Sequence, residues 1–171
     1  ASKKNCAAAI SSPGAAIASS EVQSVHLLSS LIDVAVAERR TEYRSKTNIE
    51  ISAPPTSQSY GLFAKVQSTE FKRMLSNLIN NAVEAVGERG QIVIHATPSK
   101  DNVVISISDN GEGIPAERLA SLGTRGITFG KPNGRGLGLF HAKETAKAWG
   151  GDLKIESVEG KGTIVKVTLP R

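Results

Sequence analysis

Asp109-Asn110-Gly111-Glu112-Gly113-Ile114-Pro115 is the stretch around which the rest of the chain is organised. It follows an alternating apolar run, residues 103–108, which predicts a strand that gives way to a glycine-rich loop. Side chains alternate along a strand, so Asp109 ends an apolar row on one face: Val103, Ile105 and Ile107. An inward-facing carboxylate needs a hydrogen-bond donor, and the neighbouring sequence offers none. We therefore expect a ligand amine to be the partner of Asp109.

Length, charge and cysteine content limit the possible functions of the chain. The chain has 171 residues, a net charge of +5 and one cysteine, Cys6. Its length suits one domain with a sizeable core. Lysine and arginine are scattered, without interleaved aromatic residues, so we expect no nucleic-acid partner. One cysteine excludes an internal disulfide framework and a cysteine-based zinc site, and it favours a reducing, cytoplasmic setting.

No targeting or membrane segment is evident. The alanine-rich start lacks the layout of a signal peptide, and no apolar run approaches the roughly 20 residues of a spanning helix. We expect no membrane contact by this part of the protein, although a longer parent could be membrane-anchored. Residues 1–20 are interpreted as a tail, a linker or the remnant of an upstream segment, and residues 21–171 as one domain.

Hydrophobic periodicity predicts three helices. The first runs from Val22 to about Arg44. The second is capped by Ser68 or Thr69 and is closed by Gly87 with Gly90. The third covers residues 136–149 and is followed by two glycines. Each has an apolar stripe on one side, so all three are expected to pack against a sheet.

Alternation predicts the strands of that sheet: residues 48–52, 62–66, 92–96, 103–109, 152–157 and 163–169. A turn at residues 98–101 makes the third and fourth strands a hairpin. The fold class is α+β, a two-layer α/β sandwich in which three helices cover one face of a mostly antiparallel mixed sheet. Between Glu112 and Gly134 the apolar period disappears and glycines multiply, which indicates a functional lid.

Asparagines on the second helix form one candidate site. Asn77 and Asn81 are four residues apart and therefore share a face, with Glu84 further along. Asparagine is a middling helix former, so three of them within residues 77–81 are unfavourable unless they are used. Solvent-facing amides are the alternative interpretation. Because Mg²⁺ takes oxygen ligands and shares them with substrate phosphates, one protein amide can suffice for a magnesium site.

A glycine run, Gly134-Arg135-Gly136-Leu137-Gly138-Leu139, forms a second candidate site. Alternate glycines allow backbone N–H groups to approach a ligand, and the following helix N-terminus favours an anion, so the run predicts a phosphate site. A flexible hinge is the alternative. Lys131 precedes the run and Arg135 lies within it, and both side chains would attract a triphosphate. The spacing fits neither a dinucleotide fingerprint nor a P-loop, and neither an EF-hand nor a nucleophile elbow is present.

Taken in order along the chain, these pieces resemble the ATP-binding catalytic domain of sensor histidine kinases. Residues 77–85 resemble the N box and residues 109–114 the first glycine box. Residues 134–139 resemble the second glycine box, and Gly162-Thr163 the terminal Gly-Thr element. The resemblance covers about residues 22–171 and extends to the superfamily of gyrase, heat-shock-ninety and mismatch-repair ATPases. It implies the Bergerat ATP-binding fold, with ATP and Mg²⁺ as cofactors.

The resemblance also implies roles for individual residues. Asp109 would accept the adenine amino group, helped by a water and Thr163, and Asn81 would bind Mg²⁺. Gly111 and Gly113 would leave room for the base and sugar. The phosphates would be bound by the second glycine run and by the lid: Gly134, Arg135, Gly136, Leu137 and Gly138, with Thr128 and Lys131.

Position 77 separates the classes of the superfamily. Its hydrolysing members have a glutamate there that activates water, whereas the amide of Asn77 cannot act as a general base. The resemblance therefore implies transfer of the γ-phosphoryl group to a protein histidine, with Asn77 and Lys131 as catalytic residues. The alternatives are an anti-sigma-type serine kinase used as a nucleotide-controlled binding module, or an autonomous ATPase.

None of the three histidines fits the phosphoacceptor, which should lie on a separate dimerising helix followed by an acid. His26 precedes two leucines, His95 is in a predicted strand and His141 is in the third helix. The expected partners are therefore a histidine-bearing dimerisation domain of the same parent protein and a downstream response regulator in two-component signalling.

Overall fold

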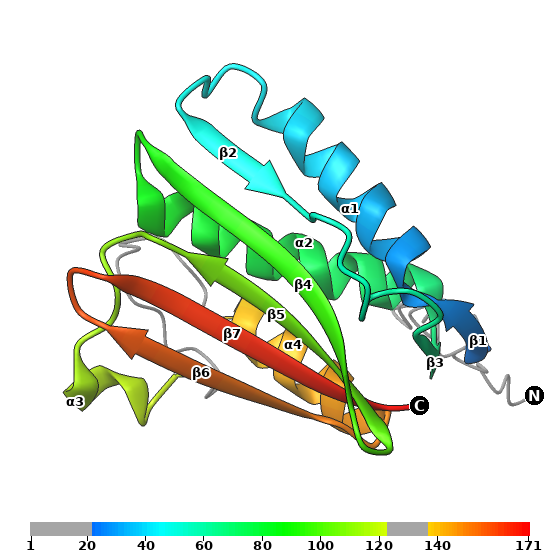
Figure 1. Ribbon diagram of the computed structural model, residues 1–171. Coiled ribbons are helices and arrows are strands. Elements are labelled where there is room, and N and C mark those ends of the chain that lie inside the picture. The colour runs from blue at the N-terminus through cyan, green and yellow to red at the C-terminus, as the bar shows by residue number, and fades with distance from the viewer. Residues whose placement is uncertain (1–21, 123–136) are drawn as a thin grey trace, which may run out of the picture.

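The computed structural model describes residues 22–122 and 137–171, and Figure 1 shows a twisted sheet with its helices on one face. The five strands lie in the order β2-β4-β5-β7-β6. The β2–β4 pair is parallel and the other three pairs are antiparallel. The strand bounds are β2 (Ile49–Ser52), β4 (Gly90–Ser99), β5 (Asn102–Asp109), β6 (Asp152–Val158) and β7 (Gly162–Pro170).

Helices α1 (Leu28–Glu42), α2 (Ser68–Val86) and α4 (Leu137–Ala148) cover that face, which confirms the predicted two-layer α+β class. α2 buries its apolar stripe against the inward-facing isoleucines of β4 and β5, in accord with its helical period. Phe71 of α2 stacks on Trp149 beyond the end of α4, with 6.3 Å between the ring centroids, so the two helices share one core.

A short strand, β1 (Ser24–Leu27), replaces the start of the predicted first helix. It pairs antiparallel with β3 (Phe63–Val66), and Ser24 lies opposite Val66. The prediction was wrong here because strand pairing with a segment far along the chain overrides local preference. The helix begins at Leu28, which is fully buried.

Three smaller predictions also need correction. Gln67, not Ser68 or Thr69, is the cap residue of α2, and the cap has no side-chain hydrogen bond. The β4–β5 turn is only two residues long, with Lys100 at a positive φ of 50°, so residues 98 and 99 belong to β4. Gly90 begins β4 instead of closing α2.

The lid region begins with structure of its own. A single helical turn, α3 (Ala116–Leu119), lies beside β6 where the sequence predicted only loop. Within the described ranges, every helix is too short or too polar to cross a lipid bilayer.

Candidate functional site

Asn77 and Asn81 lie one turn apart at the border between the buried and exposed sides of α2. Both side chains are half-buried, and they share a face as predicted. The start of α4 packs against this face: a Cβ placed on Gly138 would lie 3.7 Å from the Asn77 Cβ. The structure thus brings the asparagine helix and the end of the predicted phosphate run together.

Asn80 serves a different purpose from its two neighbours. Its Oδ1 accepts a hydrogen bond from the Tyr43 hydroxyl at 3.2 Å and from Arg39 Nη1 at 3.5 Å. Both donors are on α1, and Arg39 also pairs with Glu42. Burial raises the pKa of Tyr43, which keeps its hydroxyl protonated as a donor. Asn80 therefore fixes α2 to α1, whereas Asn77 lies against the start of α4.

Asp109 ends β5, the central strand, and is flanked in register by Ile92 of β4 and Thr163 of β7. Its carboxylate is half-buried, and burial raises its pKa, while backbone hydrogen bonds from Gly111 and Thr163 act in the opposite direction. The Gly111 N–H donates to Asp109 Oδ1 at 2.9 Å.

The expectation that nearby sequence offers no donor to Asp109 was therefore wrong. The loop turns back on the strand end and brings the Gly111 amide to the carboxylate. A carboxylate has about four acceptor sites, so the backbone bonds from Gly111 and Thr163 leave capacity for a ligand N–H.

The glycines of the loop are required by the protein's own packing. A Cβ on Gly111 would lie 2.4 Å from the carbonyl oxygen of Ala85 in α2. A Cβ on Gly113, whose φ is +69°, would lie 2.1 Å from the carbonyl oxygen of Val158. At both glycines, main-chain atoms occupy the place that a side chain would take. The role of these glycines in leaving room for a base and sugar stays a prediction.

Backbone hydrogen bonds clamp the same loop on both sides. The Glu112 N–H donates to Ala85 at 3.0 Å, and the Gly160 N–H donates to the Glu112 carbonyl at 2.6 Å. Asn110 is also tied to β4, because its Oδ1 accepts the Gln91 N–H at 2.8 Å. The loop is therefore held between the end of α2 and the β6–β7 turn before any ligand binds.

Ser157 on β6 links the loop to the terminal Gly-Thr element. Its hydroxyl accepts the Ile114 N–H, donates to the Gly162 carbonyl and contacts Thr163 Oγ1, each at 2.9 Å. Because Ser157 has one proton and spends it on Gly162, the Thr163 hydroxyl must donate to Ser157. Thr163 then presents lone pairs, not a proton, on the side of Asp109.

Sequence reasoning missed Ser157. Its alternation in a strand resembles that of any surface serine, and the only available signal is its place opposite Thr163 in the β6–β7 hairpin. That signal requires the register of the hairpin. Gly162, at a φ of +123°, allows the start of β7 to lie close to the end of β5, because a Cβ added to it would be 2.0 Å from the Asp109 carbonyl oxygen.

A groove of about 390 Å³ opens where α2 meets the start of α4. Glu70 lies at its edge, with its carboxylate 3.3 Å from His141 Nε2 and 3.6 Å from Arg73 Nη1. Charged and apolar side chains from both helices form its walls: Arg73, Asn77, Leu137, Gly138, Phe140, His141 and Glu144.

Several predicted site residues lie outside the described residues: Thr128, Lys131, Gly134, Arg135 and Gly136. Of the predicted phosphate run, the structure describes Leu137 and Gly138 at the start of α4. In residues 22–122 and 137–171, no three His, Cys, Asp or Glu side chains gather into a possible metal cluster. Any cation there would need oxygen atoms from a ligand besides the Asn81 amide.

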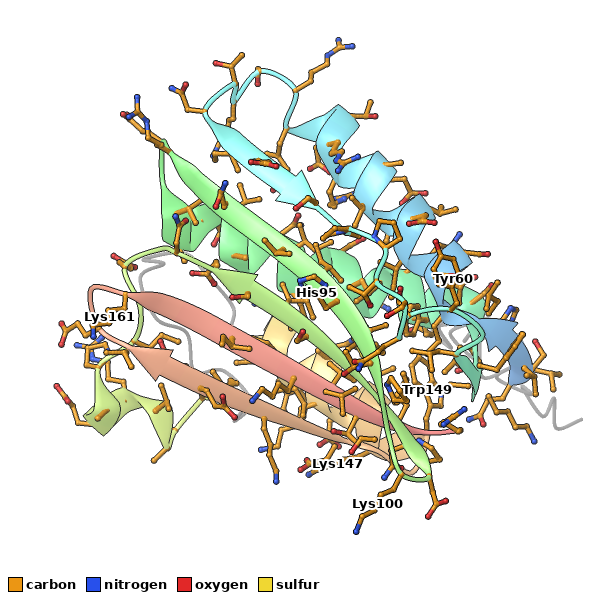
Figure 2. All side chains as sticks on the ribbon, viewed as in Figure 1. Tyr60, His95, Lys100, Lys147, Trp149 and Lys161 are labelled. Carbon is orange, nitrogen blue, oxygen red and sulfur yellow. The ribbon has the colours of Figure 1, made fainter. Side chains whose placement is uncertain are left out.

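The histidines are distributed over three different elements. His26 is in β1, His141 is in α4, and Figure 2 shows His95 on β4. His95 alternates with the buried residues 94 and 96, so it lies on the sheet face that the helices leave uncovered.

The mixed sheet, with helices on one face and a glycine loop at the end of its central strand, defines a two-layer domain of the ATPase type. The profile of the histidine kinase-, DNA gyrase B- and HSP90-like ATPases matches residues 66–171, more than half of the chain. The chain therefore belongs to this family.

Relatives with curated names include sensor histidine kinases and sporulation kinases. The chain is 37% identical over 99 residues to the sensor histidine kinase ZraS of Salmonella typhi, a match that covers 57% of this chain and 21% of that protein. It is 34% identical over 110 residues to sporulation kinase C of Bacillus subtilis, covering 64% and 26% of the two chains. This chain thus spans about a quarter or less of those relatives.

A solved structure agrees with these matches. The catalytic domain of histidine kinase ThkA is similar with a TM-score of 0.75 and 28% identity, covering 86% of this chain and 95% of that one. This confirms the predicted resemblance to catalytic domains of histidine kinases, in both sequence and fold.

Proposed function

We propose that this chain binds ATP with Mg²⁺ and supplies the γ-phosphoryl group to a histidine on a separate dimerisation domain of a longer parent protein. A response regulator would receive the group next, in two-component signalling, and we place the domain in the cytoplasm. The observation that carries the proposal is the amide of Asn77 where α2 meets α4, because the superfamily's hydrolysing members use a carboxylate at that position.

Adenine recognition rests on Asp109 and Thr163. The backbone bonds from Gly111 and Thr163 use acceptor sites of the carboxylate, and the remaining sites suit the N–H of an adenine amino group. Thr163 donates its own proton to Ser157, so it would accept a hydrogen bond from a bridging water. Guanine carries a carbonyl oxygen in place of that amine, which would face the carboxylate without a proton between them.

Magnesium binding rests on Asn81 and on the ligand itself. A neutral amide oxygen fits a hard cation that keeps several waters and shares phosphate oxygens. When bound, Mg²⁺ would neutralise charge on the phosphates during transfer. The backbone amides of Leu137 and Gly138 lie at the N-terminus of α4, where the helix dipole favours an anion. Thr128, Lys131, Gly134, Arg135 and Gly136 complete the proposed phosphate site.

The proposed reaction is a direct displacement. A lone pair on the acceptor histidine nitrogen forms the P–N bond, while the bond between the γ-phosphorus and its bridging oxygen breaks and leaves ADP with the electron pair. Asn77 would orient a water or assist the metal, and Lys131 would stabilise the charge of the phosphoryl group. Catalysis then comes from positioning and charge neutralisation, without a general base from position 77.

The test combines binding with transfer. The 171-residue chain should be stabilised more by ATP with Mg²⁺ than by GTP with Mg²⁺, because a ligand bound only to the native state raises the melting temperature. With radiolabelled ATP, it should label a dimerisation domain from a related sensor kinase at histidine. Labelling of a serine-bearing partner instead would support the anti-sigma-type kinase. Rapid ATP hydrolysis by the chain alone would support an autonomous ATPase.

A further inference from the structure

We propose that Arg73 is a further phosphate-binding residue, whose guanidinium contacts the terminal, γ-phosphoryl group of ATP. The inference rests on the proposed function and adds a residue that none of the sequence motifs contains. Arg73 lies in α2, outside the N box, and it shares the wall of the groove with Asn77 and Gly138.

Arg73 continues the row of the two asparagines along one face of α2. Arg73, Asn77 and Asn81 are successive members of an i, i+4 row, so they follow one face at intervals of about 6 Å. The adenine end of this face is fixed by the glycine loop, since Gly111 packs against Ala85. A nucleotide whose base lies at that end has its phosphates towards the N-terminus of the helix, where Arg73 follows Asn77.

The wall of the groove opposite Arg73 belongs to α4. Leu137 and Gly138 begin α4 and line the groove together with Arg73. Their backbone belongs to the helix N-terminus that would attract phosphate oxygens. A phosphoryl group between the two helices therefore has backbone donors on the side of α4 and the guanidinium on the side of α2.

The Arg73 guanidinium has N–H donors available for an anion. Its side chain is 61% exposed, and its ion pair to Glu70 is long at 3.6 Å. An exposed pair of this kind contributes little stability. Glu70 is also engaged by His141 at 3.3 Å, so its charge is shared between two partners. Guanidinium has five N–H donors in a planar fork that suits phosphate oxygens, so it can bind an anion and keep Glu70 nearby.

A neighbouring lysine gives a matched control. Lys72 is the adjacent residue on α2, but a helix turns about 100° per residue, so its side chain leaves the helix in a different direction. It is not among the residues that line the groove. Loss of Lys72 removes the same formal charge from the same turn, and it therefore reports the long-range electrostatic part alone.

The experiment is calorimetric titration of the whole 171-residue chain with ATP and with ADP, both with Mg²⁺. Arg73→Ala should weaken ATP binding about tenfold, as expected for loss of a charge-assisted hydrogen bond, and leave ADP binding within about twofold of the unmutated chain. Arg73→Lys should restore part of the preference for ATP. Lys72→Ala should change the two affinities equally and by less than about twofold.

Two results would overturn the inference alone: equal weakening of ATP and ADP by Arg73→Ala, or no effect on either nucleotide, while the unmutated chain binds both. Binding of neither nucleotide by the unmutated chain would overturn the proposed function and, with it, this inference. Melting temperatures of all three variants show whether each chain is folded. If Arg73→Ala is not folded, the ATP and ADP affinities of Arg73→Lys decide the test.

Discussion

The two ends of the candidate site are built in different ways. At the adenine end, the loop after β5 is fixed by backbone, because Gly111 and Gly113 fill spaces where any Cβ would collide with main-chain atoms. At the proposed phosphate end, α2 and α4 meet through side chains around a groove, with the Glu70 carboxylate 3.3 Å from His141 Nε2. The loop at the proposed adenine end is thus fixed by main-chain contacts of the fold, whereas the proposed phosphate end is held by weaker side-chain contacts.

The largest effect is expected from Gly113→Ala. A Cβ 2.1 Å from the Val158 oxygen adds overpacking to the strain of a left-handed φ, so unfolding should become easier by about 3 kcal/mol. Chemical denaturation measures this, and the melting temperature should fall by about 10 °C. Gly160→Ala is the control: its φ is +76° but nothing lies within 4 Å, so about 1 kcal/mol is expected. Equal losses would show that the close approach carries no weight.

A smaller effect is expected from Ser157→Ala. The change leaves the Ile114 N–H and the Gly162 carbonyl without their partner and frees the Thr163 proton, so the chain should lose about 2 kcal/mol of stability. The preference for ATP over GTP should also fall, since Thr163 no longer presents only lone pairs to the pocket. Ser157→Thr retains the hydroxyl and should keep the preference. An unchanged preference in Ser157→Ala would remove Ser157 from base recognition.

At the proposed phosphate end, His141→Ala should cost about 1 kcal/mol or less, because a partly exposed contact such as that between His141 and Glu70 contributes little. Thermal melts measure the cost. Lys147→Ala removes the ion pair from Lys147 to Glu144 within α4, whose side chains are both 53% exposed, and should cost still less. A loss for His141→Ala as large as that for Gly113→Ala would contradict the contrast between the two ends.

The smallest effect concerns pH. Burial raises the pKa of Asp109, so its carboxyl contributes stability while it is protonated. This contribution is lost as the pH rises from 3.8, the ordinary pKa of the group, through the raised pKa of the folded state. Asp109→Asn cannot ionise and should gain stability relative to the unmutated chain over that rise. Melting temperatures at acidic and neutral pH measure the difference. A difference that does not change with pH would show that burial does not disfavour the charged carboxylate.

Sequence patterns predicted the parts of the fold that depend on local periodicity. The apolar stripe of α2 and the alternation in β5 needed only neighbouring residues, and they also placed Asn77, Asn81 and Asp109 correctly on their elements. The β1–β3 pair was missed because its strands are distant in sequence.

The site details that escaped prediction depend on which segments meet. Asn80 reads like its two neighbours in the sequence, and only the position of α1 shows that it binds Tyr43. The donor to Asp109 was missed because the loop folds back on its own strand. The glycines were recognised as special, but their neighbours, Ala85 and Val158, come from elements that only the tertiary fold brings to them.

The central claim is that the Asp109 carboxylate accepts a hydrogen bond from the adenine amino group. A nucleotide-dependent melting experiment with Asp109→Asn tests it most directly. The unmutated chain should be stabilised by ATP with Mg²⁺ more than by GTP with Mg²⁺. In Asp109→Asn, binding of ATP should weaken by about 1.5–3 kcal/mol, the contribution of a hydrogen bond to a charged group, although the nucleotide-free variant is at least as stable. Equal stabilisation by ATP of the variant and the unmutated chain would contradict the account.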